Sequence, residues 1–332
     1  MTACDTQIGI AQEEIQDDTY DSIQDSSENN EAEEPEGTDE QQEPEESGDP
    51  EIEDQEESEE ETPEEITDFL QRGPYEVTDE SRTASVTNCT NMNYSVYSPS
   101  GIMNPPVVVL GHGFARGADT MTGWADHLSS WGVEVLLPTL CHYNVFAGVD
   151  HEMNGQNMKE LAIAHGATEV VYAGHSAGGL AAIIAASQDT GAAGVLGLDA
   201  TDTEGIPGVP DLIGQQYAEF VTCPAFSIMG ESSTCNASNN GLELFRMMDE
   251  SQVFKIASAD HCDFESPTDW ICESQCENPT VEFSDEEINP AVTVLGTAAV
   301  MALTGLSADG PLIWSGTGIE SWIDSGLVQG VE

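Results

Sequence analysis

The stretch that decides the fold is Glu169–Ala186, which reads EVVYAGHSAGGLAAIIAA. Its first part, 169–173, is a β-branched apolar run that predicts a buried parallel strand, and the small apolar residues after Gly179 predict a helix packed closely on a sheet. Between them lies Gly174–Gly178, a G-x-S-x-G pattern. In this context the pattern places its serine on a sharp, strained turn, where glycines let the strand and the helix approach. We therefore expect Ser176 to be a nucleophile; the alternative is a serine in an ordinary glycine-rich loop.

Strand and helix patterns alternate on both sides of this stretch. The alternation predicts an α/β fold with a mostly parallel central sheet and helices on both faces. Alternating residues over 81–99 predict an antiparallel hairpin, and the apolar run Asn289–Leu306 predicts a helix packed on the sheet rather than a membrane span. The expected strands are 107–110, 133–137, 169–173, 194–198, 225–229 and, as the last one, 253–257; the expected helices are 119–131, 151–165, 177–188, 241–249 and, as the final one, 285–305.

Charge divides the chain into two regions. Of its 63 acidic residues, 28 lie in residues 1–65, which contain no Lys or Arg. Such a segment buries too little apolar surface to offset its ordering entropy, so we expect 1–65 to be a disordered acidic tail or tether. The rest, 66–332, has the length of one large catalytic domain.

The predicted domain is itself acidic. It holds the remaining 35 acidic residues against all six Lys and Arg, a net formal charge of −29. This excess argues against nucleic acid or an anionic membrane surface as a partner. It fits a salty habitat, where ions screen the repulsion, and it equally fits an ordinary acidic secreted protein.

Eight cysteines at uneven spacing do not form a zinc pattern and favour disulfides in an exported protein. A Cys235–Cys262 bridge would brace two loops near the expected site, and Cys272–Cys276 is another candidate pair, although sequence does not fix connectivity. The opening Thr2-Ala3-Cys4 resembles the end of a bacterial lipoprotein signal, with chance as the alternative explanation. That resemblance implies a lipid on Cys4, a membrane tether, and at least one unpaired cysteine among the other seven.

A serine nucleophile needs a base and a group that orients the base. Of seven histidines, His261 lies in the loop Ser258-Ala259-Asp260-His261 after the strand 253–257, at the sheet edge where Ser176 is expected. We therefore assign His261 as the base. Asp199 ends the strand 194–198 and is the preferred acid; Glu231, after the following strand, and Asp202 are the alternatives.

The oxyanion of an acyl-transfer reaction needs N–H donors. The turn Gly111-His112-Gly113-Phe114 follows the first long strand and can aim a backbone N–H into the site. We expect the N–H groups of Phe114 and Ala177 to form the oxyanion hole.

From about residue 80 to its C-terminus, the chain resembles the α/β-hydrolase superfamily, whose order is Ser…Asp…His. Within it, the segments Gly111–Gly117, Gly174–Gly179 and Gly197–Asp202 look most like chlorophyllase-type bacterial hydrolases. That family reads G-x-D-P-V-D at the acid, so the resemblance implies Asp199, with Ala200 replacing the proline.

The same region is more distantly similar to cutinase-like polyester hydrolases, which have a braced histidine loop. Those enzymes place their acid one strand later and carry a tryptophan near the position of Asp199. Neither feature is present here. The acidic tail lies outside both resemblances.

Together these features predict a secreted or cell-surface serine esterase that acts through an acyl-enzyme and needs no metal or organic cofactor. We expect a monomer. Its expected substrate is an ester, and hydrophobic and polymeric esters are included in this expectation. The alternatives are a lipase, polyester hydrolase or thioesterase with the same triad, and a non-catalytic tethered binding protein. Because a protonated imidazole cannot accept the serine proton, activity should fall at acidic pH.

Overall fold

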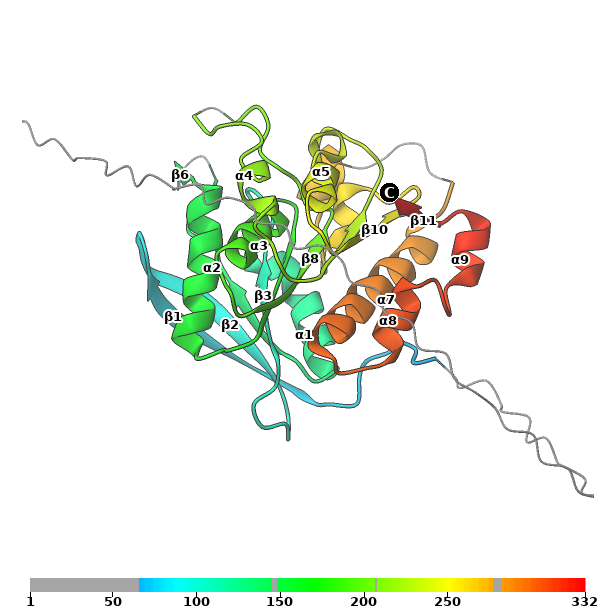
Figure 1. Cartoon of the computed structure of the whole chain (residues 1–332), viewed down its shortest axis with the longest axis horizontal. Coiled ribbons are helices and arrows are strands. Elements are labelled where there is room, and N and C mark those ends of the chain that lie inside the picture. Colours follow the sequence, from blue (N-terminus) through cyan, green and yellow to red (C-terminus); the bar gives the residue numbers. More distant parts are fainter. Residues whose placement is uncertain (1–65, 145–147, 207, 277–281, 332) are drawn as a thin grey trace, which may run out of the picture. The chain divides into compact units, whose positions relative to one another are not determined.

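A nine-stranded sheet runs through the computed structural model, which describes residues 66–144, 148–206, 208–276 and 282–331 (Figure 1). The strand order is β1-β2-β4-β3-β7-β8-β9-β10-β11, and the six strands from β4 to β10 are mutually parallel. The strands are β1 (Val77–Val86), β2 (Cys89–Pro99), β3 (Val107–Gly111), β4 (Glu134–Pro138), β7 (Val170–His175), β8 (Ala192–Leu198), β9 (Ala225–Met229), β10 (Ser251–Ile256) and β11 (Val328–Val331); β5 (Tyr143–Asn144) and β6 (Gly148–Val149) form a separate pair.

Helices connect these strands. The α-helices are α1 (Thr122–Ser130), α2 (His151–His165), α3 (Ala177–Ser187), α4 (Gln215–Ala218), α5 (Leu242–Arg246), α6 (Trp270–Cys276), α7 (Asp285–Thr304), α8 (Asp309–Trp314) and α9 (Glu320–Ser325). Three 3₁₀ turns are η1 (Ala118–Met121), η2 (Ala237–Asn239) and η3 (His261–Phe264). The boundaries of α2 follow from its caps, because the Asp150 side chain accepts from the Met153 N–H and Gly166 ends the helix at φ 91°.

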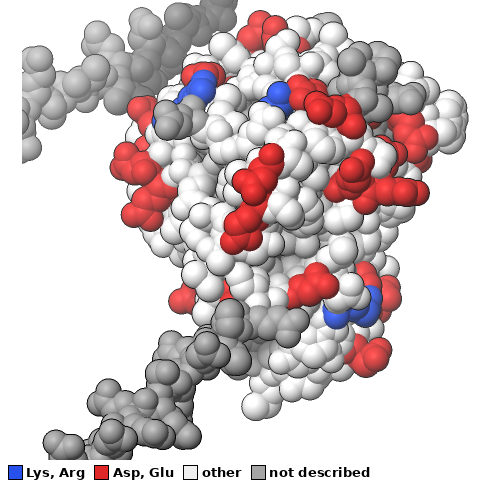
Figure 2. Space-filling view, turned by 90° about the vertical axis from the view of Figure 1, so that its right-hand side faces the viewer, with Lys and Arg blue, Asp and Glu red and all other residues white. Residues whose placement is uncertain are grey.

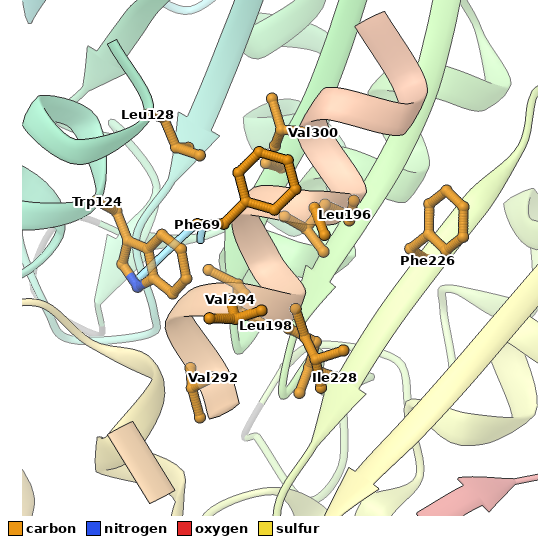
Figure 3. Packing of buried hydrophobic residues seen from close by; sticks show 14 of the residues in the cluster. Phe69, Trp124, Leu128, Leu196, Leu198, Phe226, Ile228, Val292, Val294 and Val300 are labelled. Atoms are coloured by element: carbon orange, nitrogen blue, oxygen red, sulfur yellow. The ribbon is translucent and has the colours of Figure 1, made fainter. Parts of the chain in front are cut away.

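Two apolar cores lie on the two faces of the sheet, as the α/β prediction requires. One contains side chains of α2 and α3, and the other contains side chains of α1, α7 and α8. In Figure 3, Val292, Val294 and Val300 of α7 lie near Leu196 and Leu198 of β8. The chain is therefore a mixed α/β protein with helices on both faces of a mostly parallel sheet.

Helix α7 is long and apolar enough to cross a membrane by length and composition. It packs in the core, and 61% of its most apolar window is buried. The expectation of a helix packed on the sheet is confirmed. Its start carries a capping box between Ser284 and Glu287, and Gly305 ends it at φ 66°.

The end of the chain differs from the sequence prediction. Strand 253–257 is not the last, because Val328–Val331 pairs antiparallel with β10. Helix 285–305 is not the final helix, because α8 and α9 follow it. The segment Val328–Val331, which reads VQGV, has only four residues, and its glycine has a low strand propensity. It therefore does not stand out as a strand in the sequence.

The acidic character of the domain is visible on its surface. Figure 2 shows many Asp and Glu side chains on the face in view and few Lys or Arg. The expected tail 1–65, with Cys4, lies outside the described residues.

Candidate active site

Ser176 lies on a sharp turn between β7 and α3. Its backbone has φ 55° and ψ −124°, a conformation that is strained for a residue with a side chain. A Cβ atom on Gly174 would lie 2.3 Å from the carbonyl carbon of Gly178, and one on Gly178 would lie 2.4 Å from the Gly111 oxygen. The two glycines of the motif are thus needed for the close approach of strand and helix that the sequence predicts.

The structure brings His261 and Asp199 together. The Nδ1 atom of His261 lies 2.6 Å from Oδ2 of Asp199, and both residues are buried. Because a carboxylate only accepts, this bond places the imidazole proton on Nδ1 and leaves Nε2 as the free acceptor. His261 and Ser176 line the same cavity. The imidazole with the free Nε2 therefore shares a cleft with the serine.

The Asp199 carboxylate is held by two further donors. It accepts hydrogen bonds from the Gly230 N–H to Oδ1 at 3.1 Å and from Asn236 Nδ2 to Oδ2 at 3.1 Å. Asn236 is fully buried, and its Oδ1 accepts from the N–H groups of Ser233 and Asn239. Sequence reasoning missed Asn236; its only signal is its place beside Cys235, in the loop after β9.

The two alternative acids lie elsewhere. Glu231 forms an ion pair with Lys255, at 2.6 Å, and does not contact His261 in the described structure. Asp202 is buried, and its Oδ1 accepts from the N–H groups of Thr203 and Gly214. Of the three carboxylates considered, Asp199 is the one that orients His261.

The two expected oxyanion donors both lie beside the serine. Phe114, Ser176 and Ala177 line one cavity, and Ala177 is the first residue of α3, where backbone N–H groups lack helical partners. Neither the Phe114 nor the Ala177 N–H donates a hydrogen bond to another described residue. A Cβ on Gly113 would lie 3.1 Å from His175 Nδ1, so this glycine lets the Phe114 turn approach the serine turn.

Two buried histidines shape these turns. His112 contacts the Gly113 carbonyl oxygen through Nδ1 and accepts from the Leu140 N–H at Nε2, and burial lowers its pKa to about 4. His175 Nε2 lies 2.9 Å from the His261 carbonyl oxygen, and burial holds the pKa of His175 well below its ordinary value. Both rings are therefore neutral at neutral pH and act as hydrogen-bonding supports.

A buried ion pair joins the Phe114 turn to the His261 loop, and sequence reasoning missed it. Nε and one terminal nitrogen of Arg116 each donate to a Glu265 carboxylate oxygen at 2.7 Å. The Glu265 side chain is completely buried, whereas Asp269, which also contacts Arg116 at 2.9 Å, is 41% exposed. No charge or motif pattern in the sequence marks this pair.

The disulfides differ from the two expected pairs. The structure has Cys235–Cys276 and Cys262–Cys272 in place of Cys235–Cys262 and Cys272–Cys276, and it adds Cys89–Cys141. Of the seven cysteines among the described residues, six form these bridges and Cys223 is buried and unpaired. Each of the two bridges near the site ties α6 to a neighbouring loop, so the loops are braced through the helix rather than directly to each other.

Three sulfur atoms lie close enough together to suggest a metal site. Those of Cys262, Cys272 and Cys276 are within 4.8 Å of one another. All three belong to disulfides, and a disulfide sulfur is not the thiolate that binds zinc.

Two cavities are lined by Ser176. The histidine-side cavity, of about 300 Å³, includes His261 and residues of α6 in its walls. The threonine-side cavity, of about 260 Å³, includes Ala177 and Thr201. Phe114, Ser176 and Cys235 belong to both walls, so the two cavities adjoin at the serine.

Comparison with protein-family models and with curated proteins finds no match for this chain. What the site can do chemically therefore follows from its own geometry. It combines a serine on a strained turn, an imidazole oriented by a buried carboxylate, and two N–H groups that donate to no other described residue. These are the parts that acyl transfer through a serine requires.

Proposed function

We propose that this chain is a serine hydrolase that cleaves carboxylic esters through Ser176, His261 and Asp199 on an α/β-hydrolase fold. The observation that carries the proposal is the His261–Asp199 hydrogen bond in a cleft that also contains Ser176. The order Ser…Asp…His along the chain, with the serine on a turn after a central parallel strand, supports the fold assignment.

Acylation begins when Ser176 Oγ attacks the ester carbonyl carbon and His261 Nε2 takes its proton. Asp199 stabilises the imidazolium that forms. The N–H groups of Phe114 and Ala177 donate to the oxyanion of the tetrahedral intermediate. As that intermediate collapses, the ester C–O bond breaks and the imidazolium gives its proton to the departing alkoxide.

Deacylation repeats these steps with water. His261 takes a proton from water, the resulting hydroxide attacks the acyl-enzyme, and the proton then passes to Ser176 Oγ. One ester and one water thus become one acid and one alcohol. The steps require no metal or organic cofactor.

The direct test of the proposal measures ester hydrolysis and labelling by a fluorophosphonate probe, which reacts with activated serines. We expect wild type and Ser100→Ala, an exposed serine in a turn, to be labelled and active. Ser176→Ala should abolish labelling and reduce hydrolysis by at least about 10³-fold. Full activity in Ser176→Ala would overturn the proposal, and a wild type that is neither labelled nor active would favour a non-catalytic binding protein.

The proposal includes export to the cell surface, with a lipid on Cys4 as tether. Three disulfides support an oxidising compartment. The acidic surface makes nucleic acid an unfavourable partner. Mass spectrometry of the protein from its native membrane would detect a diacylglycerol on the peptide that contains Cys4.

A further inference from the structure

A cycle of hydrogen bonds joins the three residues of the proposed triad. The Ser176 N–H donates to the carbonyl oxygen of Leu198, the residue before Asp199, at 3.1 Å. The imidazole of His261 donates to Asp199 at 2.6 Å. The cycle is closed by His175, the residue before Ser176, whose Nε2 lies 2.9 Å from the His261 carbonyl oxygen. This last contact joins the strand of the nucleophile directly to the loop of the base.

The partner of His175 determines where its ring carries the proton. A carbonyl oxygen only accepts, so Nε2 of His175 carries the proton and donates it. Nδ1 then keeps its lone pair. It has no hydrogen-bond partner among the described residues and lies 3.7 Å from Oε1 of Glu265, which is too far for a hydrogen bond. Because Arg116 donates to both Glu265 oxygens, that carboxylate is satisfied without a proton from His175.

The His175 ring is enclosed on several sides. It is 1% exposed, and its centroid lies 4.5 Å from that of the His261 ring. A Cβ atom on Gly113 would lie 3.1 Å from Nδ1 of His175, so little space remains between that glycine and this edge of the ring. Burial, and then the nearby His261, hold the pKa of His175 well below its ordinary value. The ring is therefore a neutral donor in a closely packed place at neutral pH.

Given the proposed function, this donor bears on the distance between Ser176 Oγ and His261 Nε2. Asp199 holds the imidazole from the end of β8, the strand beside that of the serine. His175 holds the backbone of the same histidine from β7, one residue before the serine. We propose that His175 is a positioning residue for ester hydrolysis, whose Nε2–H keeps His261 at the distance from Ser176 that proton transfer requires. A displacement of about 1 Å between reacting groups costs about 10²-fold in rate.

A direct contact with the substrate is the competing role for His175, because its ring belongs to the wall of the histidine-side cavity. The two roles differ in their kinetics. Loss of a positioning contact lowers kcat and kcat/KM for ester hydrolysis by the same factor, whereas loss of a contact that binds the substrate raises KM and leaves kcat unchanged. Labelling of Ser176 by a fluorophosphonate should slow together with kcat, because it depends on the same proton transfer.

Three variants at this position test the donor. His175→Gln places an amide N–H about where the histidine has Nε2, His175→Asn has the same amide on a shorter side chain, and His175→Phe keeps a ring without a donor. We expect His175→Gln to stay within about threefold of the wild-type kcat, and the other two variants to lose about 10- to 10²-fold with KM unchanged. Rates are taken per folded molecule, counted by near-ultraviolet circular dichroism.

A histidine away from the site provides the matched control. His165 bonds to Glu134, the first residue of β4, and His165→Phe should leave kcat, KM and the labelling rate unchanged. The proposal is overturned if His175→Asn and His175→Phe are as active as His175→Gln. It is also overturned if all three lose the same activity, or if the losses lie in KM alone.

A measurement on the wild type does not depend on the folding of any variant. Nitrogen NMR of the protein labelled in its histidine rings distinguishes a ring nitrogen that carries a proton from one that does not. At neutral pH we expect His175 to have a protonated Nε2 and an unprotonated Nδ1. A ring protonated at Nδ1 alone could not donate to the His261 carbonyl oxygen and would overturn the proposal.

This inference rests on the proposed function, and the two fail in different ways. A wild type that is neither labelled by fluorophosphonate nor active fails the proposed function. A wild type that is labelled and active, with no difference among the three His175 variants, remains a serine hydrolase and fails only the positioning role of His175.

Discussion

Removal of Arg116 should expose how far the site depends on its buried ion pair. Arg116→Met keeps most of the aliphatic stem but leaves the completely buried Glu265 carboxylate without its bidentate partner. Breaking a buried pair by removing one partner costs about 3–5 kcal/mol, because the remaining charge stays desolvated. We therefore expect Arg116→Met to lower the free energy of unfolding by that amount.

Two variants serve as controls for this prediction. Asp269→Asn removes the other carboxylate on Arg116, and because Asp269 is 41% exposed its loss should cost no more than about 1 kcal/mol. Arg116→Met combined with Glu265→Leu removes both charges, so most of the stability should return. The comparison separates the cost of an unpaired buried charge from simple loss of contact.

Urea unfolding with the disulfides intact, followed by tryptophan fluorescence, measures these free energies. A loss in Arg116→Met no larger than that in Asp269→Asn would refute the buried-pair reasoning. The reasoning would also be refuted if the double variant lost as much free energy of unfolding as Arg116→Met and Glu265→Leu lose separately, added together. Ester hydrolysis by the folded fraction of Arg116→Met should also fall, because the pair holds the Phe114 turn against the loop of His261.

Three further predictions concern the same side of the sheet. Asn236→Ala removes a hydrogen-bond donor to Asp199, so kcat/KM for ester hydrolysis should fall about tenfold or more. The acid limb of the pH–rate profile should also move to higher pH, and a folding defect alone would not cause this shift. Gly230→Ala places a Cβ 2.7 Å from the Ala259 oxygen and should lower the free energy of unfolding in urea by about 1–3 kcal/mol. The control is Gly330→Ala, whose Cβ would have no atom nearer than 3.9 Å and which should lower it by no more than about 0.5 kcal/mol. The pKa of Asp263 is raised to about 7 by burial and then by Asp260, so the folded state holds a proton that the unfolded chain releases above about pH 4. Stability from this group therefore falls as pH rises toward 7, and Asp263→Asn should melt at a higher temperature than wild type at about pH 8 but not at about pH 4 in calorimetry.

Strand order along the chain was enough to predict that the three central residues of the candidate site lie at one edge of the sheet. Ser176, Asp199 and His261 each follow a strand of one parallel sheet, and the carboxyl ends of such strands lie at the same edge. The short apolar runs and the glycines around Ser176 are local signals, so they can be recognised in the sequence without knowledge of tertiary contacts. The same holds for α2, whose expected bounds, 151–165, match the structure.

The supports of the site could not be predicted, because they depend on how loops fold back. Asn236 donates to Asp199 from the loop after β9, directly before three residues with positive φ, Ala237, Ser238 and Asn239. The disulfide pairs depend on where α6 lies. One bridge joins α6 to Cys235, 41 residues before Cys276, and the other joins it to Cys262, 10 residues before Cys272. Neither feature has a periodic or compositional signature in the chain.

The position of Asp199 explains why a glycine follows β9. Asp199 ends β8 and His261 follows β10, so the histidine loop has to cross the end of β9 to reach its carboxylate. At that crossing the Glu231 N–H donates to the Ala259 oxygen at 2.7 Å, and the Gly230 N–H donates to Asp199. A side chain at Gly230 would lie where the Ala259 carbonyl passes. A carboxylate directly after β9 would not need this crossing, so Gly230 leaves room for the His261 loop to reach Asp199 at the end of the neighbouring strand.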